Sequence, residues 1–308
     1  MNLPQRLLAG GVFASLRLLG LLPLRWLHAG GRGLAVLYRL LRLYEWRIAR
    51  RNLDLCFAHV PVDERDRLLR EALRQSAMTL MEWPRLWTGP PGRALSLVRE
   101  VHGLGHFEAA LAGPAGLIVA APHLGDWELL NRWLASRTPL SIVYRPPDSR
   151  AMEAVLLRAR AAPGVTQVRA ESGAVRSLFR VLHAGGVVGI LPDQQPKRGD
   201  GEFAPFFGIE AFTMTLLSRL AQRTGAQVLF AWAERVDAGR AFDIHVLPAP
   251  EGIDAADQRV ATAALNRGVE ACVRQNPAQY LWGYKRFSMR PGDQPGLYRD
   301  LDRRPAGC

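Results

Sequence analysis

The sequence predicts an α/β fold in which a mixed central sheet is flanked by helices, preceded by an N-terminal membrane-associated helical segment. From about residue 95, short apolar runs alternate with turns and helical stretches, a pattern typical of a largely parallel or mixed sheet with helices on both faces. The first 52 residues carry arginine-rich helical patterns. The chain has 308 residues, 48% of them hydrophobic, which suits one sizeable core or two small ones and excludes a disordered or polytopic membrane protein.

The positive charge is concentrated at the N-terminus. The formal net charge of +12 is carried almost wholly by arginine, because Lys197 and Lys285 are the only lysines. Residues 1–60 hold nine arginines against two acidic residues, Glu45 and Asp54. These arginines alternate with leucine, valine and tryptophan, which favours a membrane-surface element over a disordered nucleic-acid-binding arm. We therefore expect anionic partners and no nucleic acid.

The first apolar segment is a marginal membrane span. Leu7 to Leu24 is apolar except for Ser15 and Arg17, and as a helix it would be about 27 Å long against a hydrocarbon core of about 30 Å. Arg17 would cost a few kcal/mol at the bilayer centre. The segment can therefore span the membrane or lie in its interface. A cleaved signal peptide is disfavoured, because no clear small-residue cleavage site is present.

Two further helices are expected before the sheet begins. Gly33 to Asn52 has apolar residues at helical spacing and arginines on the other side, which is an amphipathic pattern. Pro61 to Leu86 begins with acidic residues and should end near Pro84, since proline disfavours a helix interior. We thus divide the chain into membrane-anchor helices at 1–52 and a second unit at 53–308, with a helical lead-in at 53–92 and an α/β core at 93–291.

The α/β core contains six expected strands with helical stretches between most of them. They are Leu95 to Val101, Gly116 to Ala121, Leu140 to Tyr144, Val187 to Leu191, Gln227 to Ala233 and Phe242 to Leu247. Functional residues are expected at the ends of such strands. The cysteines, at positions 56, 272 and 308, lie far apart and suggest neither a disulfide framework nor a zinc site, so a reducing compartment is expected.

A histidine follows the strand expected at 116–121. His123 can take a proton from an alcohol if a nearby carboxylate fixes its tautomer and stabilises the resulting cation. Asp126 would lie on the same side of a regular helix as His123, whereas Glu128 would lie about 140° away. Glu128 fits only if His123 precedes the helix, which Gly125 permits. The alternative is that His123 caps the helix and both acids interact with its dipole.

These residues are also the first part of a family resemblance. A strand ending in His-x-x-x-x-Asp/Glu resembles the lysophospholipid acyltransferase superfamily, and His-Leu-Gly-Asp-Trp-Glu at 123–128 resembles its lipid A lauroyl and myristoyl acyltransferase branch. Other segments resemble that branch in the same order, between about residues 100 and 291. They are Val-Tyr-Arg-Pro at 143–146, Glu-Ser-Gly-Ala-Val-Arg at 171–176, Gly-Ile-Leu-Pro-Asp-Gln at 189–194, Pro-Phe-Phe-Gly at 205–208, Ala-Phe-Thr at 211–213 and Gln-Tyr-Leu-Trp-Gly-Tyr-Lys-Arg-Phe at 279–287.

The resemblance implies that residues 53–308 form an acyltransferase domain, and it implies the donor, the acceptor and the site of the reaction. A fatty acyl group would pass from an acyl carrier protein thioester to a hydroxyl of a lipid A precursor, which is a glycolipid. The reaction would take place on the cytoplasmic side of the bacterial inner membrane, and the N-terminal segment would contact the lipids of that membrane. The resemblance makes His123 the base and Glu128 the acid that orients it, with Asp126 as the lesser candidate. Direct attack on the thioester needs no acyl-enzyme, and no cofactor is expected.

Two other functions remain open. One is an acyltransferase for another membrane lipid, such as an aminolipid, a phosphatidylinositol mannoside or a lysophospholipid. The resemblance favours a saccharolipid acceptor over a glycerolipid, because glycerolipid relatives carry Asp at the position of Glu128. The other is a basic protein without catalysis that binds membrane or nucleic acid, whose binding would depend strongly on salt and not on His123. That second alternative leaves the ordered motif series unexplained.

Six charged or amide residues are expected to bind substrate, and one of them is Asp126, which is also the lesser candidate for the acid beside His123. Arg145, just after a strand, is expected to contact a phosphate or oxyanion, with a solvated surface arginine as the alternative. Arg169 and Arg176 are weaker candidates for the same contact. Asp193 and Gln194 follow the strand at 187–191 and are expected to meet the acceptor sugar or brace the site, or to form a turn or helix cap.

An aromatic segment is the expected wall of the acyl channel. Phe207 and Gly208, together with Phe206, are assigned to that wall, with plain core packing as the alternative. No metal is expected, because glycines lie between His102 and His106 and no third ligand is apparent. The pair Gly103 and Gly105 lacks the third glycine of a dinucleotide-binding turn. The absence of Gly-x-Ser-x-Gly counts against an α/β-hydrolase.

Overall fold

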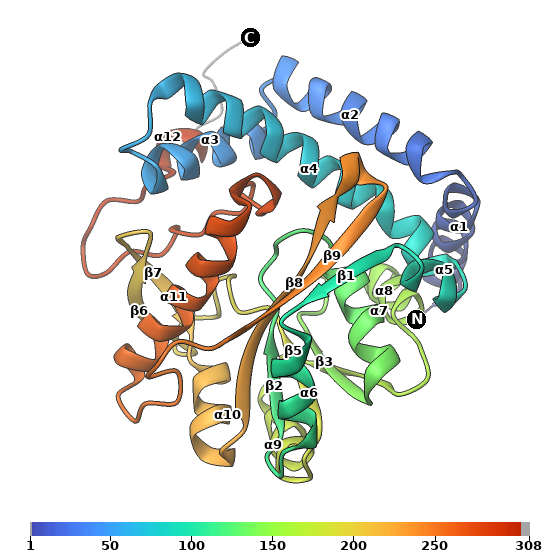
Figure 1. Cartoon of the computed structure of the whole chain (residues 1–308). Coiled ribbons are helices and arrows are strands. Elements are labelled where there is room, and N and C mark those ends of the chain that lie inside the picture. Colours follow the sequence, from blue (N-terminus) through green and yellow to red (C-terminus); the bar gives the residue numbers. More distant parts are fainter. Residues whose placement is uncertain (1, 303–308) are drawn as a thin grey trace.

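The computed structural model describes residues 2–302, which form a seven-stranded mixed sheet with helices on both faces (Figure 1). The predicted fold class is therefore confirmed. The strand order is β1-β9-β8-β2-β5-β3-β4, and all neighbours are parallel except β8 and β9. The strands are β1 (Val98–His102), β2 (Leu117–Ala120), β3 (Leu140–Tyr144), β4 (Val165–Arg169), β5 (Val187–Ile190), β8 (Gln227–Val236) and β9 (Ala241–Pro248). A separate antiparallel hairpin consists of β6 (Gly201–Phe206) and β7 (Ile209–Met214).

Strand β2 lies at the centre of the sheet and is buried on both faces. Ile118 and Ala120 belong to one hydrophobic core, while Leu117 and Val119 belong to the other. The first face is covered by α9 (Ser172–His183), α10 (Leu216–Thr224) and α11 (Gln258–Gln275), and the second by α5 (Pro91–Leu95), α6 (Leu104–Ala112) and α7 (Trp127–Arg137). Parallel strands covered on both faces are continuous apolar runs, which explains why they are recognisable in the sequence.

The strand predictions differ from the structure mainly at the edges of the sheet. Strand β1 begins at Val98, three residues later than expected, because α5 occupies Pro91–Leu95. Strand β4 was not expected, since it is an edge strand with alternating polar and apolar residues. The β6–β7 hairpin was also not expected. Strand β8 extends beyond Ala233 to Val236, where it pairs with β9.

Four helices precede α5 and the first strand: α1 (Leu3–Gly20), α2 (Leu24–Leu40), α3 (Tyr44–Cys56) and α4 (Val62–Thr88). The single helix predicted at 33–52 is interrupted between α2 and α3, where Arg42 has a left-handed φ of 44°. Helix α4 does not end near Pro84 but continues to Thr88 with Pro84 buried inside it. Gly20 packs so closely there that a Cβ atom would lie 2.5 Å from the Pro84 carbonyl oxygen.

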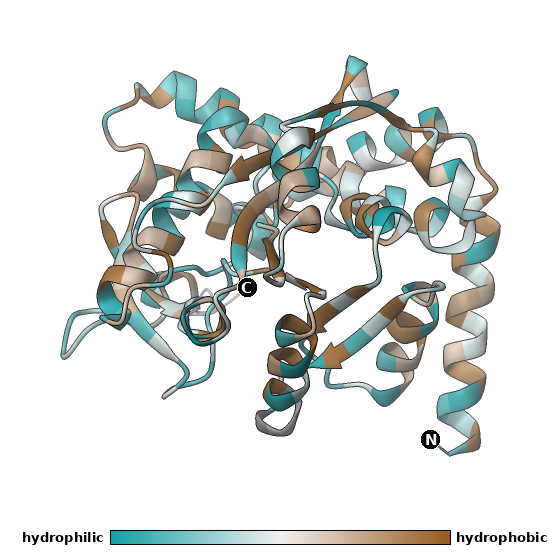
Figure 2. Cartoon of the chain, turned by 60° about the horizontal axis from the view of Figure 1, so that its bottom comes forward, coloured by the Kyte–Doolittle hydropathy of each residue, from teal (hydrophilic) through white to brown (hydrophobic). Residues whose placement is uncertain are grey.

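We call the bent pair of helices α1 and α2 the N-terminal hairpin. It lies against α4 and α8 (Arg150–Ala159). Within residues 2–302, neither of them alone, nor any other single helix, has the length and hydropathy to span a bilayer; the two qualify only together, with a bend of 113° between them. The hairpin nevertheless exposes many large apolar side chains, and Figure 2 shows α1 projecting at the edge of the molecule. They are Leu3, Leu7, Leu8, Leu18, Leu19, Leu21, Leu22, Trp26, Val36, Leu37 and Leu40.

The remaining short elements are two 3-10 helices, η1 (Asp237–Gly239) and η2 (Pro277–Gln279), and α12 (Arg299–Asp302). Cys56 and Cys272 are buried and free. The third cysteine, Cys308, lies outside the described residues.

Candidate active site

The segment between β2 and α7, which we call the catalytic turn (residues 122–126), is held by backbone hydrogen bonds on two sides. The N–H of Asp126 donates to the carbonyl of Ala233 in β8 (2.9 Å). The N–H of Gly125 donates to Gln279 O (3.0 Å), and the N–H of Leu281 donates to His123 O (2.9 Å). The turn is thus fixed between β8 and residues 279–281, although these segments are far apart in the sequence.

Glycine is required at position 125 for two reasons. Its φ is +64°, which side-chain-bearing residues rarely adopt. A Cβ atom at this position would also lie 1.9 Å from the carbonyl oxygen of Ala233. The close approach of the turn to β8 therefore depends on Gly125, and the turn places His123 before α7 rather than within it.

His123 is held by Asp193, which follows β5. The Nδ1 atom of His123 lies 2.8 Å from Asp193 Oδ1, and the backbone N–H of His123 donates to Asp193 Oδ2 at 3.0 Å. The Asp193 side chain is 3% exposed. This contact fixes the tautomer with a proton on Nδ1, so that Nε2 is free to accept a proton. The side-chain amide of Gln194 lies 3.2 Å from Nε2.

The environment keeps Asp193 ionised. Burial by itself would raise the pKa of Asp193, but the charge of His123 and the hydrogen bonds from its ring and backbone outweigh burial and lower that pKa. An anionic Asp193 would stabilise an imidazolium if His123 took a proton. Trp127 packs edge-on against the His123 ring, with 4.9 Å between ring centroids, and limits its motion.

The partner of His123 differs from the one that we expected. Glu128 lies in the first turn of α7 and is buried, but its carboxylate binds Arg160, with Arg160 Nε 3.0 Å from Oε1, and accepts a hydrogen bond from Trp87 Nε1 at 3.0 Å. Glu128 therefore connects α7 to α4 and to the end of α8. The reason is geometric: α7 begins at Trp127, so its first turn directs Glu128 towards those helices, while the end of β5 brings Asp193 to His123.

Asp126, which we expected to be near substrate, is fully buried and caps α7. Its Oδ1 accepts hydrogen bonds from the backbone N–H groups of Glu128 and Leu129, both at 3.0 Å. Asp126 lines neither of the cavities described below. A side-chain oxygen that accepts these hydrogen bonds stabilises the start of the helix.

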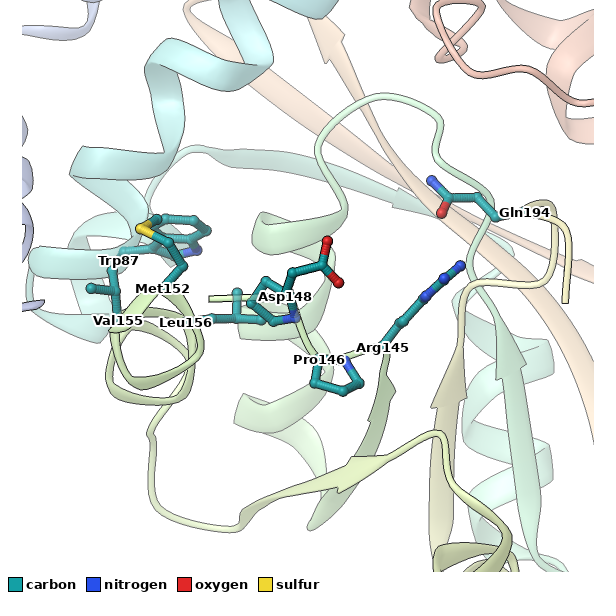
Figure 3. Close-up of a pocket in the computed structure, with 9 residues that line it drawn as sticks. Trp87, Arg145, Pro146, Asp148, Met152, Val155, Leu156 and Gln194 are labelled. Carbon is teal, nitrogen blue, oxygen red and sulfur yellow. The ribbon is translucent and has the colours of Figure 1, made fainter. Parts of the chain in front are cut away.

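A cavity of about 550 Å³ lies beside the His123 pair. At one end Arg145 and Gln194 point towards each other, and at the other Trp87, Met152 and Leu156 form an apolar wall (Figure 3). Arg145 is exposed and takes part in none of the ion pairs found among residues 2–302. Gln194 belongs to the cavity wall and its side-chain amide also contacts His123 Nε2, so the imidazole lies next to a residue of this wall.

A second cavity, of about 290 Å³, lies behind a layer of tryptophans. Trp83 stacks on Trp87 with 5.2 Å between ring centroids and meets Trp127 edge-on at 5.6 Å. Trp87 lines the first cavity, while Trp83 and Trp127 line the second. The rest of the second cavity is largely apolar and includes Ala77 and Leu80 of α4. The tryptophans thus separate two spaces on either side of the site.

Four other candidate residues do not lie with His123. Arg169 binds Glu153 and Arg176 is exposed on α9. Phe207 and Gly208 form the turn of the β6–β7 hairpin, where the Phe207 ring packs 5.3 Å from Phe57. None of the four lines either cavity.

One group of possible metal ligands occurs among the described residues, at Glu100, His102 and Asp243. Glu100 contacts His102 Nδ1 at 3.6 Å, while Asp243 contacts Nε2 at 3.6 Å. Asp243 also accepts two hydrogen bonds from Arg99. Because the two acids approach different ring nitrogens and a guanidinium already occupies Asp243, the group fits a surface ion-pair cluster better than a metal centre.

Sequence reasoning missed Arg160 and Trp87, and it did not pair Asp193 with His123. For Arg160 and Trp87 there was no local signal, since they reach Glu128 from different helices. For Asp193 a signal existed: both β2 and β5 are followed by proline and then by the polar residue, at 122–123 and at 192–193. Polar residues placed alike after neighbouring parallel strands lie at the same edge of the sheet.

Comparison with known proteins shows the family of the chain. Residues 2–289 match the family model described as bacterial lipid A biosynthesis acyltransferase. The chain is 31% identical over 255 residues to the lipid A biosynthesis palmitoleoyltransferase of Escherichia coli (strain K12), which covers 82% of this chain and 81% of that protein.

Two other relatives extend the comparison. The lipid A biosynthesis lauroyltransferase of Escherichia coli (strain K12) is 29% identical over 254 residues, 82% of each chain. A phosphatidylinositol mannoside acyltransferase of Mycobacterium tuberculosis (strain ATCC 25618 / H37Rv) is 31% identical over 165 residues, 51% of this chain and 50% of that one. With a family match along nearly its whole length, this chain is an acyltransferase and belongs to the bacterial lipid A biosynthesis acyltransferase family.

Proposed function

We propose that this acyltransferase moves a fatty acyl chain from an acyl carrier protein thioester to a hydroxyl of a lipid A precursor, with His123 as the general base. The observation that carries the proposal is the His123–Asp193 pair, whose Nε2 lies 3.2 Å from the side-chain amide of Gln194, a residue of the cavity wall. Family membership supports the acceptor class, because the similar proteins of Escherichia coli are named for lipid A biosynthesis.

The reaction needs one proton to move twice. Nε2 of His123 takes the proton from the acceptor hydroxyl as its oxygen attacks the thioester carbonyl, and the Asp193 carboxylate stabilises the imidazolium. The tetrahedral intermediate then collapses, the C–S bond breaks, and His123 returns the proton to the leaving thiolate. The products are an ester and a free carrier thiol. When the hydroxyl displaces the Gln194 amide from Nε2, that amide becomes available to stabilise the oxyanion.

The first cavity suits both reacting groups. Its apolar end, formed by Trp87, Met152 and Leu156, accommodates the acyl chain, and its polar end, with Arg145, suits a phosphate. Both the carrier's phosphopantetheine and lipid A precursors bear phosphates. Glu128 contributes by holding Arg160 and Trp87, so that α8 and α4, the two helices of the apolar wall, stay in place.

The N-terminal hairpin supplies the contact with the membrane. Its exposed leucines and Trp26 alternate with arginines, a composition that binds the interface of an anionic bilayer. We assign the protein to the inner membrane with its catalytic domain on the cytoplasmic side, where acyl carrier protein is available. The bend of 113° between α1 and α2 favours a hairpin lying in one leaflet over a straight span.

The test is acyl transfer by detergent-solubilised protein with a panel of acyl carrier protein thioesters and a lipid A precursor, followed by mass spectrometry. Wild type is expected to add one acyl chain and His123→Ala none. The matched control is His183→Ala, because His183 is exposed on α9.

A phosphatidylinositol mannoside and a lysophospholipid serve as competing acceptors, because one similar protein is named for acylation of the former. Acylation of either in place of the lipid A precursor would overturn the acceptor assignment. An active His123→Ala would overturn the mechanism.

A further inference from the structure

A buried cluster of four ionisable side chains lies behind the catalytic turn. His28 comes from α2, Glu82 from α4, Asp126 from the turn and Arg235 from β8. Their exposed fractions are 3%, 1%, 0% and 5%, and none of the four lines either cavity. The cluster therefore combines two carboxyl groups, one guanidinium and one imidazole without access to substrate.

Glu82 has three hydrogen-bond donors, which leaves about one acceptor site on its carboxylate. Arg235 Nε donates to Glu82 Oε1 at 2.7 Å, and a second Arg235 nitrogen donates to Oε2. His28 Nε2 lies 2.5 Å from Oε1. Burial alone would raise the pKa of Glu82, but the charge and hydrogen bonds of Arg235, assisted by His28, lower it to about 2. Glu82 is therefore the anion of the cluster.

Asp126 is placed differently. Its Oδ1 accepts two backbone hydrogen bonds, but no described residue donates to its Oδ2, which is buried. The side chain that meets the Asp126 carboxyl is Glu82. Two ionised carboxylates have only acceptors, so a contact between them in a buried place requires a proton on one of them. Because Glu82 already has its donors, the proton belongs to Asp126.

We propose that Asp126 is a positioning residue whose carboxyl stays protonated and donates a hydrogen bond from Oδ2 to Glu82, which fixes the catalytic turn against α2, α4 and β8. Burial, followed by the charge of Glu82 and the hydrogen bond to it, raises the pKa of Asp126 well above its usual value, and Arg235 only partly opposes this. The role in catalysis rests on the proposed function of His123, three residues earlier.

A second hydrogen-bonded chain acts in parallel. Arg235 donates to Thr79 Oγ1 at 2.7 Å, and Thr79 Oγ1 donates to the carbonyl of Gly125 at 3.2 Å. The cluster thus holds the turn at the Gly125 carbonyl and at the Asp126 carboxyl. Through His28 it also connects the N-terminal hairpin to the turn. The hairpin therefore contributes to the position of His123 as well as to membrane contact.

The first measurement compares the same substitution at two aspartates. Asp126→Asn keeps an oxygen to cap α7 and gains an N–H that donates to Glu82, so it should retain most of the wild-type kcat. Asp126→Ala removes both contacts and should lower kcat by about 100-fold, as expected for a displacement of the base by about 1 Å. Asp193→Asn is the matched control and should be strongly impaired, because the asparagine lacks the charge that His123 requires.

The second measurement does not depend on acyl transfer. The infrared spectrum of wild type should contain the carbonyl band of a protonated carboxylic acid at neutral pH, shifted in D₂O and absent from Asp126→Asn. The unfolded protein loses the Asp126 proton above a pKa of about 3.9, whereas the folded protein keeps it up to its raised pKa. Wild type therefore loses stability as the pH rises between these two pKa values, and the melting temperature of Asp126→Asn should rise relative to that of wild type over the same pH range.

The proposal is overturned if the band is missing, or if Asp126→Asn is as inactive as Asp126→Ala. Inactivity of wild type on every acceptor, with the band present, would count only against the proposed function.

Discussion

His123 and Asp193 are separated by 70 residues, which is also the register offset between the two strands that precede them. Leu117 pairs with Val187 and Ala120 pairs with Ile190 across the parallel ladder of β2 and β5. The His123–Asp193 pair thus continues the pairing of the sheet beyond the ends of both strands. The His123–Asp193 contact is therefore positioned by the centre of the sheet. Substitutions at Asp193, Glu128 and Gly125 test how the contact is supported.

Asp193→Asn should lower kcat by about 100- to 10,000-fold, since the ring loses its stabilising anion and its fixed tautomer. KM should change little, because Asp193 faces His123 rather than the cavity. Steady-state kinetics on a carrier thioester, with circular dichroism to confirm folding, provides the measurement. A variant with normal kcat would show that another group orients the base.

The same variant has a predictable pH dependence of stability. The pKa of Asp193 is lowered in the folded protein, so its contribution is present above the unfolded pKa of about 3.9 and is lost as pH falls through the folded pKa. The free energy of unfolding of wild type should therefore exceed that of Asp193→Asn at neutral pH and approach it in acid. Urea unfolding at several pH values measures the difference; a constant difference would contradict the pairing.

Glu128→Gln should destabilise the fold by about 3 kcal/mol, because it leaves the guanidinium of Arg160 without its buried charge partner. Chemical denaturation measures this loss, and Glu171→Gln, on an exposed pair with Arg169, is the control that should change little. Activity should fall less than in Asp193→Asn at a temperature where both variants are folded. If Glu128→Gln instead kept full stability and lost all activity, Glu128 would have a direct chemical role.

Gly125→Ala should destabilise the protein by at least about 2 kcal/mol from backbone strain alone, and the clash with the Ala233 carbonyl adds to this loss. Gly105→Ala in α6 is the matched control: no atom lies within 4 Å of its added Cβ, and alanine in a helix is favoured by about 1 kcal/mol. Thermal unfolding distinguishes the two variants. Equal melting temperatures would mean that the catalytic turn can move away from β8.

Leu18→Asp and Leu21→Asp should each weaken binding to anionic vesicles about tenfold or more, because a buried leucine contributes roughly 1.5–3 kcal/mol. These side chains are 69% and 67% exposed. Val260→Asp is the control, since Val260 is 48% exposed on α11, on the other side of the molecule in Figure 1. Vesicle co-sedimentation measures the effect. If the control weakened binding equally, the hairpin would not be the membrane-binding surface.

The sequence was sufficient for the features that depend on local pattern. Continuous apolar runs identified the central strands, and a histidine after one of them identified the site of the turn. The edge strand β4 and the β6–β7 hairpin lack such runs, because each has an exposed side. The break at Arg42 was hidden because the helical spacing of apolar residues continues across it.

The partners of the site residues depended on packing between distant segments. Whether Glu128 or Asp193 meets His123 is decided by where α7 begins and by the β2–β5 register, neither of which the spacing of the motif contains. Likewise, the burial of Asp126 depends on Glu82 and Arg235, which come from α4 and β8. A motif predicts which residues are important more readily than which of them touch.

The backbone partners of the catalytic turn at residues 279–281 have a consequence for biosynthesis. The N–H of Gly125 and the carbonyl of His123 find those partners only after the polypeptide has been translated past Leu281. All strands of the sheet have by then been synthesised. A nascent chain that is already attached to lipid through its first helices would consequently not react with thioesters. The enzyme would become active only in one of the last steps of folding.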